Sequence, residues 1–204
     1  MDLKKEIAYF MRRLYRQKLT TTSGGNISAK KGNSVFITPS AIDKGEMMTE
    51  QVGEVDLEGT IINSKHKLSI ETAMHLAIYK ARPDIQAIVH AHPPYGTAFA
   101  SSNKTLNSEL TSEGRLVLGN IAFAKYELMG TQELANVVAE QSKTSNVILM
   151  ENHGVIALGK TLLEAFDRLE VLEFTAKINF VTETLNMRKP LIKEQLGEID
   201  KMNE

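Results

Sequence analysis

The run Ala87-Ile88-Val89-His90-Ala91-His92-Pro93-Pro94 joins two kinds of predicted structure. Its first half, residues 87–90, predicts a short apolar strand, and the prolines that follow prevent that strand from continuing. A helix is predicted over residues 69–80, with Ser69 as its N-cap, and a short helix is predicted over residues 95–101. A strand between two helices is typical of the α/β class of folds.

The same alternation extends outward in both directions along the chain. Some neighbouring strands are separated only by short turns, which indicates hairpins. We therefore expect one α/β domain over residues 1–204 with a mixed sheet and helices on both faces, and a polar C-terminal tail, 188–204, that is loose. The further predicted helices are 3–17, 131–141 and 161–186, and the further predicted strands are 27–29, 34–38, 54–57, 60–62, 147–150 and 155–158.

The composition excludes several classes of protein. Lys and Arg total 24 against 25 Asp and Glu, a net charge of −1, whereas a dedicated nucleic-acid binder usually carries a basic excess. The chain has no cysteine, which excludes disulfides, cysteine-ligated zinc and a thiol nucleophile and fits a cytoplasmic location. Neither a secretory signal nor an apolar run of membrane-spanning length is visible, so we expect no membrane partner.

Three histidines stand at strand ends, where side chains from neighbouring strands meet. His90 and His92 alternate along an extended backbone, so both imidazoles point to one face. His153 lies in a turn between two apolar strands. Three histidines and an open fourth position make a catalytic zinc arrangement. The alternative is that one histidine is buried and hydrogen-bonded and that the other two are incidental.

Four further features are candidates for the same site. Glu71 falls in the first turn of a predicted helix, where a carboxylate either serves chemistry or simply complements the helix dipole. His75 follows four residues later and is either a fourth ligand or part of a surface polar pair. The loop 23–26 contains two glycines, which let backbone N–H groups approach an anion, although an ordinary turn has the same composition. Residues 37–40 close a strand with hydroxyl groups that suit an anion.

These pieces together resemble one known family, and six motifs carry the resemblance in order and spacing. The chain is similar to the class II aldolase/adducin family, and most similar to its fuculose-phosphate aldolase branch, over roughly residues 3–185. The motifs are Ser23-Gly24-Gly25-Asn26, Ile37-Thr38-Pro39-Ser40, Ser69-x-Glu71-x-x-x-His75, His90-x-His92, Gly130-Thr131-x-Glu133-Leu134 and Asn152-His153-Gly154.

The resemblance implies a three-layer α/β/α sandwich with a mixed, mostly antiparallel central sheet, assembled as a homotetramer with sites at subunit contacts. It implies zinc, or another divalent metal, held by His90, His92 and His153. Glu71 would approach the metal in the empty site and act as the acid/base once substrate is bound. The substrate phosphate would lie against Gly25, Asn26, Ser40 and Ser69.

The implied activity is that of a lyase in carbohydrate metabolism. A zinc-dependent class II aldolase would cleave a small ketose 1-phosphate, such as L-fuculose 1-phosphate, to dihydroxyacetone phosphate and an aldehyde. Glutamate at position 71 favours this activity over the epimerase branch, which usually has aspartate there. The alternatives are a sugar-phosphate epimerase, a dehydratase or a decarboxylase of the same superfamily, or a non-catalytic adducin-like module.

The chain departs from the branch pattern at the phosphate pocket and at the proton donor. Ser40-Ala41 stands where the branch has Thr-Gly, and Ser69-Ile70 stands where it has Ser-Ser. The tyrosine that a neighbouring subunit would contribute falls near Thr111, in a stretch without tyrosine, and the C-terminal tyrosine is also missing, because Tyr126 is the last one. The group that protonates the leaving aldehyde is therefore unassigned, with Glu71 or water as candidates.

Overall fold

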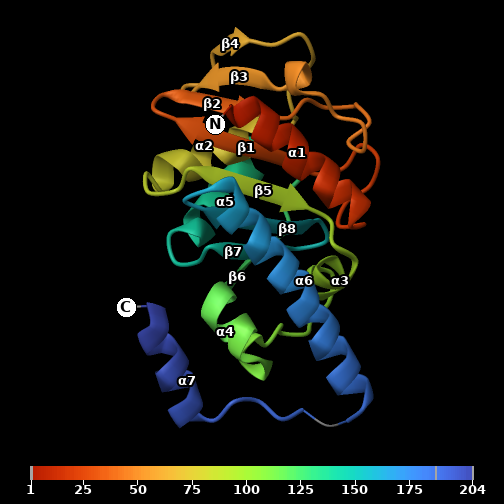
Figure 1. Ribbon diagram of the computed structural model, residues 1–204, viewed down its shortest axis with the longest axis vertical. Helices are drawn as coiled ribbons and strands as arrows, with labels where there is room; N and C mark the ends of the chain where they lie inside the picture. Colours follow the sequence, from red (N-terminus) through yellow and green to blue (C-terminus); the bar gives the residue numbers. More distant parts are fainter. Residues whose placement is uncertain (1, 187, 204) are drawn as a thin grey trace.

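In the computed structural model, which describes residues 2–186 and 188–203, an eight-stranded sheet lies between two layers of helices (Figure 1). The strand order is β4-β3-β2-β1-β5-β8-β7-β6, and every neighbouring pair is antiparallel except β6 and β7. The predicted three-layer sandwich with a mixed, mostly antiparallel sheet is confirmed. The strands are β1 (Asn26–Lys31), β2 (Ser34–Ile37), β3 (Gly53–Asp56), β4 (Ile61–Asn63), β5 (Ala87–Ala91), β6 (Ile121–Ala124), β7 (Val147–Met150) and β8 (Gly154–Gly159). The helices are α1 (Leu3–Arg16), α2 (Thr72–Ala81), α3 (Pro94–Ala100), α4 (Ser112–Leu118), α5 (Gln132–Ser142), α6 (Leu162–Thr184) and α7 (Lys193–Asp200), with short 3₁₀ turns η1 (Thr49–Gln51), η2 (Ser108–Leu110) and η3 (Lys201–Asn203).

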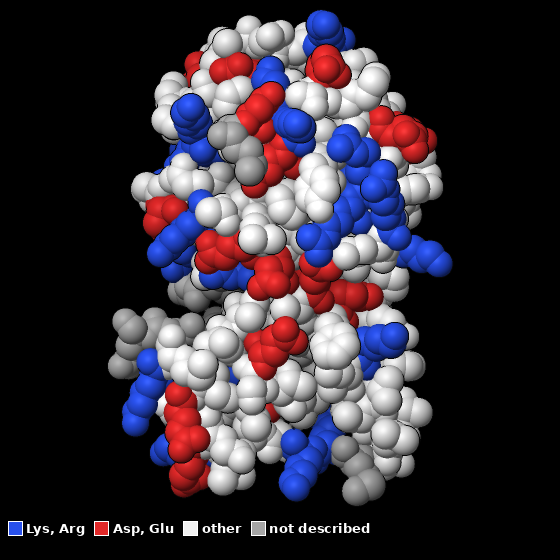
Figure 2. All heavy atoms as spheres, in the orientation of Figure 1, with Lys and Arg blue, Asp and Glu red and all other residues white. Residues whose placement is uncertain are grey.

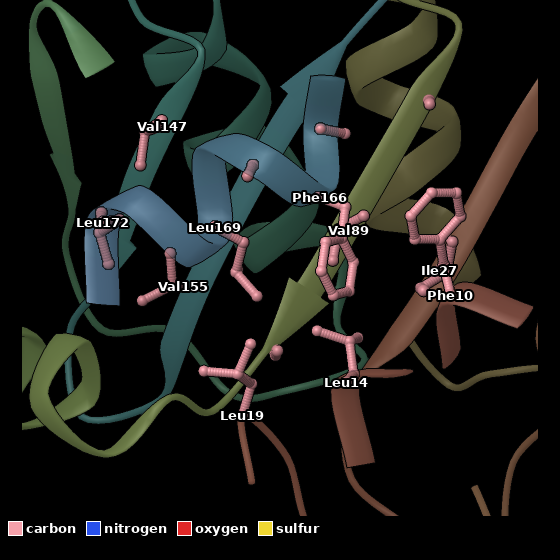
Figure 3. Packing of buried hydrophobic residues seen from close by; sticks show 14 of the residues in the cluster. Phe10, Leu14, Leu19, Ile27, Val89, Val147, Val155, Phe166, Leu169 and Leu172 are labelled. Atoms are coloured by element: carbon pink, nitrogen blue, oxygen red, sulfur yellow. The ribbon is translucent and has the colours of Figure 1, made fainter. Parts of the chain in front are cut away.

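One face of the sheet packs against α1, α3 and α6. Apolar side chains of these helices and alternate residues of the central strands form a continuous buried cluster (Figure 3). The rings of Phe10 and Phe166, from α1 and α6, lie with their centroids 5.0 Å apart over Ile27 and Val89 of the sheet. Burial of this apolar surface provides most of the free energy that holds α1 and α6 in place.

The opposite face of the sheet packs against α2 and α5, and it carries polar residues in its middle. Ile88 of β5 lies in the apolar cluster on this side, whereas its neighbours Ala87 and Val89 lie in the cluster on the other side. Side chains alternate along a strand, so His90 shares the α2 face with Ile88. Asn26 of β1 pairs directly with His90 in the antiparallel register. The topology therefore places the polar ends of β1 and β5 under the start of α2.

The start of α2 differs from the prediction. The helix begins at Thr72, because Ser69 forms a turn in front of it: the Ser69 hydroxyl accepts a hydrogen bond from the Glu71 amide (3.2 Å), and its carbonyl accepts one from the Thr72 amide (3.1 Å). Thr131, the first residue of the helix predicted over 131–141, is the N-cap of α5, because its hydroxyl accepts a hydrogen bond from the Leu134 amide. The turn in front of α2 directs the Glu71 side chain into the sheet edge.

The second half of the chain contains elements that the sequence patterns did not reveal. Helix α4 and strand β6 occupy a stretch to which we assigned no element, and β6 adds to the edge of the sheet parallel to β7. In the tail, α7 packs against α4, and Arg115 forms a two-point ion pair with Asp200 at 2.8 Å. That the tail is loose in solution stays a prediction.

The turn after β2 contains Ala41, one of the departures from the branch pattern. Ala41 has a backbone φ of +52°, in the left-handed region that favours glycine. A non-glycine residue there costs about 1–2 kcal/mol, so the glycine of the branch pattern would be the less strained residue at this position.

The surface agrees with the nearly neutral composition. On the face shown in Figure 2, basic and acidic side chains are intermingled rather than gathered in one basic patch. Among the described residues, none of the helices combines the length and the apolar character that a membrane crossing requires.

Candidate metal and substrate site

The three predicted histidines come together at one end of the sheet. His90 lies near the end of β5, His92 follows it, and His153 directly precedes β8, which runs antiparallel to β5. The C-terminal end of β5 therefore lies beside the N-terminal end of β8. The ring centroids are 4.8 Å apart for His90 and His92, 4.9 Å for His90 and His153, and 5.7 Å for His92 and His153. One nitrogen from each ring lies within 4.8 Å of the others, so this group can hold a metal ion.

Two glycines allow this close approach. Gly25 has a φ of +67°, and a Cβ there would lie 2.8 Å from the carbonyl oxygen of His90. A Cβ on Gly154 would lie 2.7 Å from the Ala91 carbonyl oxygen and equally close to the His92 ring. Only glycine fits at either place without moving the backbone that carries the histidines.

The orientation of His90 exposes one ring nitrogen to its neighbours. Its Nδ1 donates to the carbonyl of Val155 at 2.9 Å, so in the neutral ring Nε2 carries the lone pair. Among the described residues, this buried Nε2 has no hydrogen-bond partner, and neither has Oε1 of Glu71. Nε2 lies 3.2 Å from Oε2 of Glu71, and Nε2 of His153 lies 3.1 Å from Oε1. A lone pair facing a carboxylate is repulsive unless a cation lies nearby, so these residues fit a divalent metal.

The protonation states also suit a metal. Burial lowers the pKa of His90 and lowers that of His92 to about 3, so both imidazoles are neutral at neutral pH. Burial raises the pKa of Glu71, but the nearby His90 and His153 and a hydrogen bond from Asn26 outweigh it and hold the pKa well below its usual range. Neutral imidazoles beside a carboxylate are the donor set that zinc binds.

A cavity of about 520 Å³ opens beside the histidines. All four residues predicted to bind the substrate line it, together with Glu71, His92 and His153, and the predicted set is Gly25, Asn26, Ser40 and Ser69. Ile70, which stands where the branch has a serine, also lines the cavity and is 50% exposed.

The two serines of this set differ in their hydrogen bonding. The Ser40 hydroxyl already donates to the carbonyl of Leu68 at 2.9 Å, so it must turn before it can donate to a ligand. The Ser69 hydroxyl accepts from the Glu71 amide, and its own proton remains available to an anion in the cavity.

Lys44 is a cavity residue that sequence reasoning missed. Its side chain is 1% exposed, and its ammonium donates to the carbonyl of Pro39. Burial lowers its pKa to about 8, and within the described part of the chain no carboxylate forms an ion pair with it. A lysine between an aspartate and a glycine looks like a solvated turn residue, so the sequence offers no signal for this burial.

Both interpretations of His75 were wrong. It is neither a metal ligand nor part of a surface pair, because its ring is fully buried between β1 and α2. Its Nε2 lies 2.6 Å from Oδ1 of Asn26, and its Nδ1 lies 2.6 Å from the hydroxyl of Ser28. Burial lowers its pKa to about 3, so the ring is neutral. His66, in contrast, is exposed at the surface as its lysine neighbours suggest.

Comparison with known proteins agrees with this geometry. Residues 5–180 match the family model described as "Class II Aldolase and Adducin N-terminal domain". The chain is 40% identical over 185 residues to an L-fuculose phosphate aldolase of Methanococcus maripaludis, covering 91% of this chain and 99% of the relative. It is 32% identical over 182 residues to a 3-oxo-tetronate 4-phosphate decarboxylase of Haemophilus influenzae, covering 87% of this chain and 86% of the relative.

A solved structure described as L-fuculose 1-phosphate aldolase superimposes with a TM-score of 0.90 at 31% identity, covering 100% of this chain and 97% of the other. The sequence comparison and the structure comparison thus indicate the same family over almost the whole length of the chain. The chain belongs to the class II aldolase and adducin family, and it is an enzyme of the class II aldolase type.

Proposed function

We propose that this protein is a zinc-dependent aldolase that cleaves a small ketose 1-phosphate, such as L-fuculose 1-phosphate, to dihydroxyacetone phosphate and an aldehyde. The observation that supports this most is the cluster of three imidazoles and one carboxylate, Glu71, at the edge of a cavity that is also lined by a buried cation, Lys44, which forms no ion pair with the described residues. The activity is tested by incubating the zinc-loaded protein with a panel of ketose 1-phosphates and assaying released dihydroxyacetone phosphate.

In this proposal His90, His92 and His153 hold the metal. A bound zinc ion would supply Lewis-acid chemistry, drawing electrons from the substrate carbonyl and stabilising the negative charge that develops when the adjacent C–C bond breaks. The chain itself orients the ligands: the Val155 carbonyl fixes the ring of His90, and the turn before β8 fixes His153.

Glu71 is the proposed acid/base. Its Oε2 is held by the side-chain amide of Asn26 at 2.7 Å, whereas its Oε1 has no hydrogen bond to the described residues. The free oxygen takes or returns a proton at the substrate carbon or its hydroxyl. The low pKa of Glu71 keeps its carboxylate ionised at neutral pH, which is the form that can accept a proton.

The phosphate end of the substrate is proposed to lie against Gly25, Asn26, Ser40 and Ser69. Lys44 lines the same cavity and supplies a positive charge that a phosphate dianion complements. A buried ammonium without a carboxylate partner is costly in the empty protein, and an anionic ligand removes that cost.

Ile70→Ser should strengthen phosphate binding. The new hydroxyl lies at the cavity wall, and a hydrogen bond to a charged acceptor contributes about 1.5–3 kcal/mol. We expect a KM several-fold lower for the phosphorylated ketose and an unchanged KM for the unphosphorylated sugar, measured by steady-state kinetics on both. An equal change for the two sugars, or a higher KM for the phosphorylated one, means that Ile70 does not face a phosphate.

We also propose a homotetramer in the cytoplasm. Helix α6 and its C-cap residue carry large apolar side chains that are 43–64% exposed in the single chain, which is typical of an interaction surface. These residues are Leu163, Phe174, Phe180, Val181 and Leu185. Light scattering should give four times the chain mass, and a fully active monomer would contradict the assembly. Subcellular fractionation tests the location.

A second candidate function is decarboxylation of a 3-oxo acid phosphate, favoured by the similarity to the Haemophilus influenzae protein. The two activities share an electron-withdrawing metal and a phosphate end, but they differ in the bond that breaks. Release of carbon dioxide rather than an aldehyde distinguishes them in the same substrate panel.

A further inference from the structure

Two elements interleave polar side chains behind Glu71. His75 and Tyr79 are four residues apart and so lie on one face of α2, about 6 Å apart along its axis, and Glu71, the N-cap residue directly before the helix, precedes His75 by the same number of residues. Asn26 and Ser28 recur every two residues and so lie on one face of β1, about 6.7 Å apart. Because the two spacings nearly match, Asn26 fits between Glu71 and His75, and Ser28 fits between His75 and Tyr79.

The result is a continuous row of hydrogen bonds, here called the polar ladder, made by Asn26, Ser28, His75 and Tyr79. The Tyr79 hydroxyl lies 2.8 Å from the Ser28 hydroxyl, and Ser28 lies 2.6 Å from Nδ1 of His75. Nε2 of His75 lies 2.6 Å from Oδ1 of Asn26, whose Nδ2 lies 2.7 Å from Oε2 of Glu71. All four ladder side chains are at most 4% exposed.

The direction of every bond follows from the carboxylate at one end. Ionised Glu71 only accepts, so the NH₂ group of Asn26 faces it and the amide oxygen faces His75. His75 must then donate from Nε2, which leaves Nδ1 of this neutral ring as an acceptor. Ser28 therefore donates to His75 and accepts from Tyr79.

The tautomer of His75 thus controls which way the Asn26 amide faces. If His75 carried its proton on Nδ1, its bare Nε2 would face the amide oxygen of Asn26 and repel it. Asn26 would turn over, and its oxygen would then face the carboxylate of Glu71. The hydroxyl of Ser28 can donate to Nδ1 or accept from it, so the carboxylate of Glu71, acting through Asn26, selects the tautomer and Ser28 follows by donating to Nδ1.

We propose that the polar ladder is a positioning device that holds Oε2 of Glu71 and leaves Oε1 free to move the proton. His75 is its key member and acts through Asn26 without touching the substrate. The inference rests on the proposed role of Glu71 as the acid/base. It assigns a function to three buried residues, Ser28, His75 and Tyr79, that do not line the cavity.

The kinetic test compares two replacements of His75. His75→Leu fills the space but cannot donate to Asn26, and we expect kcat to fall at least about tenfold with KM within twofold. His75→Gln places an NH₂ group near the position of Nε2, and we expect it to recover much of that loss. His66→Leu, a change at an exposed histidine, is the matched control and should leave both constants unchanged. Metal content and thermal unfolding are measured for each variant.

A milder change keeps the test valid if His75→Leu does not fold. Tyr79→Phe removes only the hydroxyl at the far end of the polar ladder, and we expect a kcat about two- to threefold lower. Equal losses in His75→Leu and His75→Gln would overturn the proposal, as would a kcat within twofold of wild type in a folded, metal-loaded His75→Leu. A larger loss in Tyr79→Phe than in His75→Leu would also overturn it, because the effect should fade with distance from Glu71.

A spectroscopic readout separates this inference from the proposed function. Nitrogen-15 NMR of the resting protein without substrate should show His75 protonated on Nε2, and protonation on Nδ1 would overturn the proposal even in an active aldolase. If the wild-type protein cleaves no ketose phosphate but His75 shows the Nε2 proton, the proposed function fails and the donor direction of the polar ladder stands.

Discussion

His92→Ala should yield a folded protein that has lost its metal. His92 supplies one of three nitrogen ligands, and removing one leaves too few donors for a stable site. The change should spare the fold, because the side chain of His92 makes no hydrogen bond to the described residues. His90, in contrast, is fully buried and bonded to the Val155 carbonyl. Elemental analysis after dialysis should show metal falling from about one ion per chain to a small fraction of that.

A matched control for this measurement is His66→Ala, which changes a histidine that lies outside the cluster and is exposed. Its metal content should equal that of the wild type. Circular dichroism and thermal unfolding should be similar for both variants. Full retention of metal in a folded His92→Ala would contradict the assignment of the three histidines.

Glu71→Gln should keep fold and metal but remove most of the turnover. The amide has the same shape, and its oxygen still accepts from Nδ2 of Asn26, so the side chain stays in place. It cannot take a proton, and a general acid or base typically contributes ~10²–10⁴-fold to the rate. We expect kcat to fall by that order, measured as release of dihydroxyacetone phosphate at saturating substrate.

Glu113→Gln is the control that separates chemistry from helix-end charge. Glu113 also lies in the first turn of a helix, α4, but it is exposed and does not line the cavity. If Glu71 served only the helix dipole, both variants would lose a little stability and neither would lose activity. An activity of Glu71→Gln within about twofold of wild type would reduce Glu71 to that structural role.

Much of the site follows from local periodicity. Alternation along a strand predicts that His90 and His92 point to one face. A turn between two apolar strands could bring His153 beside them, and the pairing of β5 with β8 does so. The structure explains the glycines of the flanking motifs, because a Cβ at Gly25 or Gly154 would lie within about 3 Å of a carbonyl oxygen of the segment that carries His90 and His92.

The residues that could not be predicted depend on contacts distant in sequence. His75 is separated by 47 and 49 positions from Ser28 and Asn26, and only the pairing of β1 with α2 turns an apparent surface residue into a buried one. Lys44 is buried because its own loop folds back, so that its ammonium donates a hydrogen bond to the carbonyl of Pro39. The stretch containing α4 and β6 has short elements without clear periodicity, so its structure is set by packing against α6 and β7.

The most direct measurement of the central claim is the rate of dihydroxyacetone phosphate release from a ketose 1-phosphate as zinc is returned to the metal-stripped protein. The rate should rise in proportion to bound zinc, reach its maximum near one ion per chain, and be matched by an equal amount of aldehyde. Carbon dioxide in place of aldehyde from an oxo acid phosphate, or cleavage that proceeds equally well without metal, would contradict it.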